Sequence, residues 1–281
     1  MKDGADVQLL HIDPVRMATE PPAVGISVML LKPPFTMLMR RDWSGMENIP
    51  PTGYGCIIAA NHVSYIDPIV LAHYIYDAGR VPCYMAKDSL FELPVAGWIM
   101  NNARQIPVHR ETGDARAALQ DAIEAIKGGA ALVIYPEGTV TRDPDFWPMH
   151  PKNGVARLAL ATGAPVIPVG QFGAQQIYDH YDRKLSLFPP KTVRVRAGEP
   201  VDISEFEGRE WNRELLDACA VKIMQDVKKA VGEVRGETPP ADLAPRPEPA
   251  RTRPATEAET AAAEAAGRAA ANRPPRPPSG S

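Results

Sequence analysis

The sequence predicts a single α/β domain with a largely buried mixed sheet flanked by helices. Between residues 55 and 234, short apolar and β-branched runs alternate with segments of helical periodicity, the order typical of an α/β fold. Five of these runs are apolar at nearly every position, as expected of strands that are covered on both faces. The part of the chain that can fold, about 215 residues, suits one domain with one hydrophobic core.

Six strands are expected in this domain. The sixth strand alternates in the order Thr-Val-Arg-Val-Arg, which is typical of a strand with one solvated face, and we expect it at an edge of the sheet. The expected strands are residues 56–60, 81–86, 105–108, 131–135, 165–169 and 192–196.

Four helices are expected around the strands. In the clearest of them, apolar residues recur on one face and Gly128 and Gly129 follow the last turn. In the last helix an apolar residue recurs every four positions from Trp211 to Val227, which indicates packing on the core. The expected helices are residues 68–77, 114–127, 154–162 and 210–231.

The domain is predicted to occupy residues 42–234, between two segments of different composition. Residues 1–22 form a polar extension. Ten of the chain's 30 prolines lie in residues 239–281, which contain no aromatic residue, Ile or Val. Such a stretch cannot bury enough apolar surface to offset the entropy of ordering it. Residues 235–281 are therefore predicted to be a disordered tail.

Residues 23–41 are predicted to be a helical segment at a membrane interface. Two apolar pieces, 23–31 and 35–39, flank Lys32-Pro33-Pro34 and precede Arg40-Arg41. Each piece is far shorter than the roughly 20 residues that span a bilayer. The pattern favours a helical hairpin that lies in the interface with its bases on anionic headgroups. The alternative is a core helix that ends at Lys32.

Charge and cysteine usage exclude several classes of protein. The formal net charge of −3 argues against a nucleic-acid binder that relies on a global positive field. Three cysteines without C-x-x-C spacing indicate a reducing compartment and no thiolate metal site. The N-terminus lacks the apolar core of a signal peptide. We expect a peripheral or monotopic protein on the cytoplasmic face of the cell membrane, with no metal ion.

The first candidate site follows the expected strand 56–60. His62 and Asp67 lie in the turn before Pro68, at the carboxyl end of a buried strand, where α/β sheets place ligands and reactive groups. A carboxylate can orient an imidazole through one ring nitrogen while the other nitrogen takes a proton. The alternative is that Asp67 only caps the helix. Ser64 is a weak candidate nucleophile, because no G-x-S-x-G turn is present.

The second candidate site follows the expected strand 131–135. Glycine beside hydroxyl residues lets main-chain amides approach an anion, and Arg142 adds a charged donor. The Glu137 carboxylate can accept from a substrate hydroxyl or hold Arg110. The alternative is an ordinary turn. The segment reads Tyr135-Pro136-Glu137-Gly138-Thr139.

Four motifs in this order resemble those of the glycerolipid acyltransferase family, in particular the bacterial 1-acylglycerol-3-phosphate acyltransferases. They are Asn61-His62-x-x-x-x-Asp67, Ile106-Pro107-Val108-His109-Arg110, Tyr135-Pro136-Glu137-Gly138-Thr139 and Val166-Ile167-Pro168-Val169. The resemblance implies that His62 is the base and Asp67 orients it. It implies that Arg110, Glu137, Gly138 and Thr139 hold the glycerol phosphate. The family more often has Phe at position 135 and Arg at position 140, and Arg142 is expected to replace that arginine.

The resemblance also implies the reaction. A fatty acyl group passes from acyl-CoA or an acyl carrier protein thioester to the sn-2 hydroxyl of 1-acylglycerol 3-phosphate, which yields phosphatidic acid for phospholipid synthesis. No cofactor and no covalent intermediate are required. The amide of Gly138 and the side chain of Lys87 are expected oxyanion donors. The alternatives are another lysophospholipid or glycerol phosphate acceptor, a lipid hydrolase or thioesterase with the same two residues, and a non-catalytic membrane scaffold.

Overall fold

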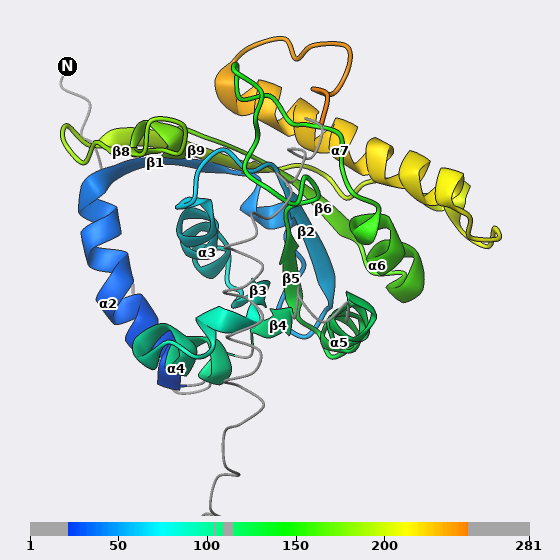
Figure 1. Ribbon diagram of the computed structural model, residues 1–281, viewed down its shortest axis with the longest axis horizontal. Coiled ribbons are helices and arrows are strands. Elements are labelled where there is room, and N and C mark those ends of the chain that lie inside the picture. The colour runs from blue at the N-terminus through cyan, green and yellow to red at the C-terminus, as the bar shows by residue number, and fades with distance from the viewer. Residues whose placement is uncertain (1–21, 104, 109–114, 247–281) are drawn as a thin grey trace, which may run out of the picture. The chain divides into compact units, whose positions relative to one another are not determined.

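The computed structural model describes residues 22–103, 105–108 and 115–246 (Figure 1). Within them, seven strands form one sheet in the order β1-β9-β6-β2-β5-β3-β4, and helices cover both of its faces. The predicted α/β class with a largely buried mixed sheet is therefore confirmed.

The sheet is mixed because β1 and β9 run against the other five strands. β9 pairs antiparallel with β6 and parallel with β1, and the remaining pairs are parallel. The strands are β1 (Met39–Ser44), β2 (Cys56–Ala60), β3 (Pro82–Lys87), β4 (Ile106–Val108), β5 (Ala131–Ile134), β6 (Val166–Phe172) and β9 (Lys191–Ala197). A short separate hairpin pairs β7 (Tyr178–Asp179) with β8 (Lys184–Leu185).

All four predicted helices are present, with ends that differ by a few residues. The helix α4 lies in a stretch for which no helix was predicted. The helices are α2 (Pro22–Leu38), α3 (Asp67–Asp77), α4 (Pro94–Asn102), α5 (Ala115–Lys127), α6 (Gly154–Thr162) and α7 (Arg213–Arg235).

The central strands are apolar on both faces because helices cover each face. In β2, Ile57 and Ala59 join the core that α5, α6 and α7 complete. The alternate residues Ile58 and Ala60 join the core that α3 completes. All four side chains are fully buried. The period-two alternation of a strand thus feeds two separate cores, as nearly continuous apolar runs predict.

The prediction that 192–196 lies at an edge was wrong. The corresponding strand β9 lies between β1 and β6, and β1 is the edge strand. Val193 and Val195 are buried on the α3 side, whereas Arg194 lies on the other face and forms an ion pair with Asp42 of β1 at 3.2 Å. The alternation therefore reports one polar face of the strand rather than an unpaired edge.

The predicted hairpin of two short helices was also wrong, because α2 is one helix that continues through Pro33 and Pro34. Each proline removes one helical hydrogen bond but keeps a helical φ, so tertiary packing can carry a helix through it. That packing comes from Val24 and Val28, which form a small buried cluster with Tyr76 of α3.

Lys32 faces the domain instead of lipid headgroups. It is 4% exposed, and its Nζ lies 2.6 Å from Oδ1 of Asp77. Arg41 reaches the other oxygen of the same carboxylate at 3.1 Å. The helical segment predicted for 23–41 ends at Leu38, since the next residue, Met39, is buried as the first residue of β1.

The domain continues past the predicted boundary at residue 234. Leu243 is buried, and Lys228 Nζ donates to the carbonyls of Pro240 and Ala241 at 2.7 Å. One compact unit therefore reaches Pro245, and the prediction of a disordered tail was wrong for residues 235–245. Leu243, an apolar residue in this proline-rich stretch, anchors the segment to the domain. The predicted extension 1–22, except Pro22, and the tail beyond Arg246 lie outside the described residues.

Candidate active site

His62 lies in the loop between β2 and α3, beside the end of β6. Its neighbour Asn61 is buried and forms a reciprocal pair with Gln171 of β6. The Asn61 side chain donates to the Gln171 carbonyl at 3.0 Å, and the Gln171 N–H donates to Asn61 Oδ1 at 2.8 Å. The Gln171 side chain returns a bond to the Asn61 carbonyl at 2.7 Å. This pair fixes the main chain immediately before His62.

The imidazole of His62 is paired with the buried carboxylate of Asp67. Nδ1 of His62 lies 2.9 Å from Oδ2 of Asp67, and the same oxygen accepts from the N–H groups of Val63 and Ser64 at 2.6 and 2.8 Å. Asp67 is fully buried, whereas the His62 side chain keeps 14% of its surface exposed. Asp67 therefore caps the turn and orients the imidazole at once. The Nε2 atom of His62 is left for proton transfer.

Ser64 is not placed as a nucleophile. Its hydroxyl is buried and donates to the carbonyl of Tyr178 at 2.7 Å. Among the described residues, no three His, Cys, Asp or Glu side chains gather where they could hold a metal ion. The reactive group that this geometry supports is the His62–Asp67 dyad.

Glu137 lies behind the dyad with both carboxyl oxygens engaged by the main chain. Oε1 accepts from the N–H of His62 at 2.9 Å, and Oε2 accepts from the N–H of Met149 at 3.1 Å. The side chain is 1% exposed. Glu137 thus joins the loop after β2 to the segment before α6. These two contacts already occupy both oxygens of the carboxylate. Its predicted contact with substrate stays a prediction.

Burial raises the pKa of Glu137 to about 8, and the N–H groups of Met149 and His62 offset this only in part. When the pKa of a carboxyl group is higher in the folded than in the unfolded protein, the group makes its full contribution to stability at pH values below the pKa of the unfolded state. That contribution is lost as the pH rises towards 8. Between pH 5 and 8 we expect the free energy of unfolding of the wild type to fall relative to that of Glu137→Gln, by up to about 1.4 kcal/mol per pH unit.

Urea unfolding of both proteins across this pH range measures the difference. The glutamine variant loses one main-chain hydrogen bond, which offsets its curve by a constant amount without changing its slope. Parallel curves for the two proteins would contradict the expected titration of Glu137.

Gly138 and Thr139 lie at the mouth of the site with His62. Gly138 has a φ of +73°, which favours glycine. Its N–H, the expected oxyanion donor, instead donates to the carbonyl of Tyr135 at 2.9 Å. The N–H of Thr139 has no acceptor within the described part of the chain. The amide of Thr139 is therefore one of those at this turn that no described residue engages.

Lys152 is a candidate site residue that the sequence analysis missed. A β-carbon built on Gly138 would lie 2.9 Å from the Nζ of Lys152, so the ammonium group lies against this turn. The main-chain N–H of Lys152 donates to the Pro136 carbonyl at 2.7 Å, which holds the residue beside the motif. Its position two residues before α6 was the available signal, but a lysine before a helix is ordinarily solvated.

The remaining predicted cations are less defined. Arg142 is exposed at the far end of the same loop. Lys87 ends β3, as predicted, but the structure does not describe the position of its side chain. Arg110 also lies outside the described residues. Their roles in substrate binding stay predictions.

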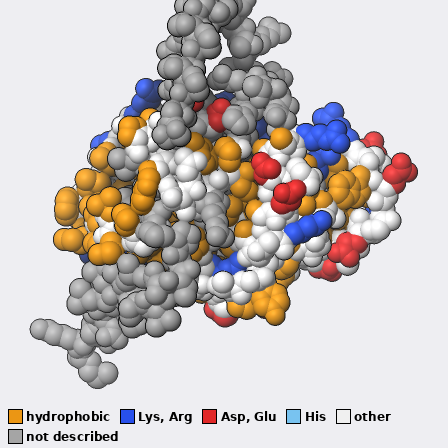
Figure 2. Space-filling model, turned by 90° about the horizontal axis from the view of Figure 1, so that it is seen from below, with side chains coloured by type: hydrophobic (Ala, Val, Ile, Leu, Met, Phe, Trp, Pro, Cys, Tyr) orange, Lys and Arg blue, Asp and Glu red, His pale blue; other side chains and the backbone are white. Residues whose placement is uncertain are grey.

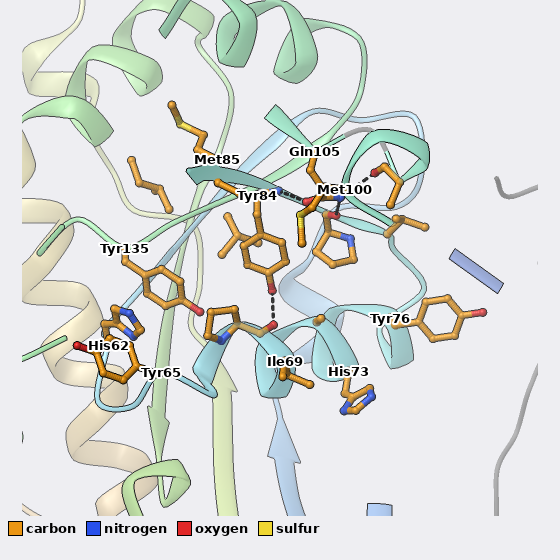
Figure 3. A pocket seen from close by; sticks show the side chains of 18 of the residues that line it. His62, Tyr65, Ile69, His73, Tyr76, Tyr84, Met85, Met100, Gln105 and Tyr135 are labelled. Atoms are coloured by element: carbon orange, nitrogen blue, oxygen red, sulfur yellow. Dashed lines mark hydrogen bonds between the residues drawn. The ribbon is translucent and has the colours of Figure 1, made fainter. Parts of the chain in front are cut away.

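A cavity of about 780 Å³ starts at His62 and extends along α3 (Figure 3). Most of its wall is apolar. At 1.5 Å per residue, the wall from Pro68 to Tyr76 is about 12 Å long. Val24 and Val28 of α2 line the end near Tyr76. One face of α3 lines the cavity with Pro68, Ile69, Ala72, His73 and Tyr76.

A histidine paired with a buried carboxylate at the mouth of a long apolar cavity is an arrangement that can perform general-base chemistry on an amphipathic substrate. Residues 40–171 match the protein-family model described as Acyltransferase. This segment, which includes both dyad residues and all four motifs, is thus similar to the family that the motifs indicated.

Several proteins similar to this chain are named after one reaction. The chloroplastic 1-acyl-sn-glycerol-3-phosphate acyltransferase of Brassica napus is 30% identical over 139 residues, which are 49% of this chain and 39% of that protein. The 1-acyl-sn-glycerol-3-phosphate acyltransferase of Borreliella burgdorferi is 31% identical over 136 residues, which are 48% of this chain and 52% of that protein. The chain thus spans about half or less of these relatives.

The fold also matches a solved structure. The crystal structure of the 1-acyl-sn-glycerophosphate acyltransferase PlsC from Thermotoga maritima aligns with a TM-score of 0.60 and 23% sequence identity. The alignment covers 78% of this chain and 81% of that one. This likeness establishes that the two chains share a fold.

Proposed function

We propose that the protein transfers a fatty acyl group from a thioester to the sn-2 hydroxyl of 1-acylglycerol 3-phosphate, which yields phosphatidic acid. The observation that carries the proposal is the dyad at the mouth of the cavity, where Nδ1 of His62 lies 2.9 Å from the buried Asp67 carboxylate. The names of the similar proteins support the same reaction. Phospholipid synthesis is the pathway that uses it.

In the proposed mechanism, Nε2 of His62 takes the proton from the acceptor hydroxyl while the hydroxyl oxygen attacks the thioester carbonyl. The C–S bond then breaks, and the thiolate leaves with the proton that the imidazolium returns. Asp67 stabilises the imidazolium and fixes the tautomer. The free N–H of Thr139 is the candidate donor for the oxyanion. The mechanism needs no cofactor besides the acyl-CoA or acyl carrier protein co-substrate.

The acceptor phosphate would meet the cations at the mouth of the site. Lys152 lies against Gly138, and Arg142 follows on the same loop. Arg110, which the resemblance assigns to the phosphate, would complete the set. Charge-assisted contacts of this kind are about twice as strong as neutral hydrogen bonds. The acyl chain of the donor would occupy the cavity along α3, where it meets mainly apolar side chains.

We also propose that the protein works at a membrane surface on the cytoplasmic side, because a product with two acyl chains is nearly insoluble in water. None of the described helices is long and apolar enough to cross a bilayer. However, α2 exposes Ile26, Met29, Leu30 and Met37, and α4 exposes Trp98. Hydrophobic side chains gather on the side of the molecule where α2 and α4 lie in Figure 1, as the view from below shows (Figure 2). This apolar face is the proposed contact with lipid.

Replacing Met29, Leu30 and Met37 together by glutamate should weaken binding to vesicles of anionic and zwitterionic lipid by at least about tenfold. Each of these side chains is more than half exposed and would lose the free energy of entering the bilayer surface. Co-sedimentation with vesicles measures the effect. Trp211→Glu is the matched control, because Trp211 is an exposed aromatic residue just before α7. Equal binding of the triple variant and the wild type would contradict the proposed contact.

The reaction itself is tested with purified protein in detergent. An acyl-CoA or acyl carrier protein thioester is offered with 1-acylglycerol 3-phosphate, glycerol 3-phosphate or other lysophospholipids, and the products are identified by mass. We expect phosphatidic acid as the main product. Release of free fatty acid without any acceptor would favour a thioesterase or lipid hydrolase, and a different lysolipid product would change the acceptor. Absence of any turnover would favour a scaffold.

A further inference from the structure

After α7 the chain turns back along the helix. We call residues 237–245 the post-α7 segment (orange in Figure 1). The N–H of Glu237 donates to the Gly232 carbonyl at 3.0 Å, and a β-carbon built on Gly232 would lie 2.9 Å from the Glu237 carbonyl oxygen. Lys228, about one helical turn earlier, donates to two carbonyls of the segment. Leu243 is 4% exposed and belongs to the core that α5, α6 and α7 complete. The segment is therefore fixed to the domain along its length.

The far end of the post-α7 segment pairs with the chain shortly before α6. The N–H of Ala244 donates to the Pro148 carbonyl at 3.0 Å, and the N–H of His150 donates to the Ala244 carbonyl at 2.9 Å. Ala244 and Met149 thus form an isolated parallel bridge, in which Met149 is fully buried. Two main-chain hydrogen bonds therefore set the position of Met149.

Met149 connects this bridge to the candidate active site. Its N–H donates to Oε2 of Glu137 at 3.1 Å, and Oε1 of the same carboxyl group accepts from the N–H of His62 at 2.9 Å. The Glu137 side chain thus joins the main chain of Met149 to that of His62. Because Glu137 is almost fully buried, water cannot easily replace a partner that it loses.

A second contact fixes the same loop, between β5 and α6, from the end of α7. The Arg235 guanidinium lies over the ring of Trp147, 4.1 Å from its centroid, and donates to the Asp145 carbonyl at 2.6 Å. The Thr141 hydroxyl donates to the Trp147 carbonyl at 2.9 Å, and the N–H of Thr141 donates to the His62 carbonyl at 2.7 Å. The N–H and the carbonyl of His62 are therefore both held by the loop that the post-α7 segment and Arg235 fix.

We propose that the post-α7 segment and Arg235 together are a positioning element for the proposed base: they hold the loop between β5 and α6, and this loop fixes the main chain of His62. The inference rests on the proposed function, because it assigns these residues to the same site. Neither the segment nor Arg235 lines the cavity along α3. They therefore act on the geometry of the reacting groups and not on the acyl chain. A small displacement of such groups can lower kcat by about 100-fold.

Leu243→Ala removes the buried anchor of the post-α7 segment. We expect kcat to fall by about tenfold or more, with the KM of the thioester donor within about twofold of wild type, because the cavity wall is unchanged. Leu243→Met, which fills the same space, should keep most of the wild-type kcat. Steady-state kinetics with varied donor measure both constants.

Leu215→Ala is the matched control. Leu215 is the same type of residue in the same core, at 7% exposure, but it lies in the first turn of α7, at the opposite end of the helix from the post-α7 segment. We expect its kcat to stay within about threefold of wild type. Equal losses of kcat in Leu215→Ala and Leu243→Ala would overturn the proposal, because the effect would then follow from lost stability alone.

Arg235→Lys keeps the charge but removes the planar group that stacks on Trp147. We expect kcat to fall by about threefold or more with the donor KM unchanged, because an ammonium group cannot reproduce the stack and the hydrogen bond to Asp145 together. Arg213→Lys is the control, since the Arg213 side chain is 90% exposed at the other end of α7. A wild-type kcat in Arg235→Lys would overturn the part of the proposal that concerns Arg235.

Hydrogen exchange followed by mass spectrometry separates this inference from the proposed function, because it needs no substrate. In Leu243→Ala, peptides that contain His62 or residues 141–150 should exchange at least about tenfold faster than in the wild type, and in Leu215→Ala they should not. Unchanged exchange at His62 in Leu243→Ala would overturn the coupling even if turnover falls. Faster exchange in this variant, together with a wild type that transfers no acyl group, would instead contradict the proposed reaction and support the positioning contacts.

Discussion

Replacing His62 by alanine should lower kcat by at least about 100-fold and leave the fold intact. Positioned proton transfer of this kind contributes about 10²- to 10⁴-fold, and an alcohol is hardly ionised near neutral pH without it. The hydrogen bonds that shape its loop run from main-chain N–H groups to Asp67 and Glu137 and do not depend on the imidazole. Steady-state kinetics with saturating thioester and acceptor measure the loss, and circular dichroism checks the fold.

Asp67→Asn should lose less activity than His62→Ala. The amide can turn its oxygen towards the three donors that now meet Oδ2 and leave its NH₂ at the position of the unpaired Oδ1. His150→Ala is the control, because His150 is an exposed histidine on the loop before α6. If His62→Ala keeps more than about a tenth of the wild-type kcat, the general-base assignment is wrong.

Replacing Ala72 by phenylalanine should shift the preferred acyl donor to shorter chains. Ala72 lies halfway along the face of α3 that lines the cavity, and a phenyl ring there would block the part that extends to Tyr76 and Val28. Exclusion of about four methylene groups from an apolar site costs roughly 3 kcal/mol, or about 200-fold in kcat/KM for long donors. Donors short enough to end before residue 72 should react at nearly the wild-type rate.

A series of saturated acyl-CoA donors of increasing length, compared by kcat/KM, measures the shift. Ala117→Phe is the matched control, since it adds the same ring to an exposed position of α5. A uniform loss of activity at every donor length would indicate a damaged fold. An unchanged length profile would show that the acyl chain does not occupy this cavity.

The class of fold and the dyad could be read from the sequence because both depend on local order. Continuous apolar runs such as 56–60 occur in strands that helices cover on both faces, and β2 has this structure. His62 and Asp67 are five residues apart within one turn, so their contact needs no distant part of the chain. Four motifs in order then indicated the family whose model matches residues 40–171.

Contacts between distant segments could not be predicted in this way. The alternation of 192–196 shows that one face of the strand is polar, but β1 must be found before β9 is known to lie inside the sheet. Lys32 looked like a cation for headgroups because its partner Asp77 lies 45 residues later. Likewise, the length of α2 depends on packing that carries it through two prolines.

The sequence by itself determined the α/β class, the positions of the main strands and helices, and the dyad with its family motifs. Only the tertiary structure decided that Glu137 bonds the main chain of His62, that Lys152 lies against Gly138, and that Tyr135 stacks on the base. The physical reason is the range of the interactions. Periodicity and turn chemistry act over a few residues. Lys152 lies 14 residues after Gly138, and the contacts of Glu137 and Tyr135 with His62 join two loops that meet only because the parallel strands β2 and β5 end at the same edge of the sheet.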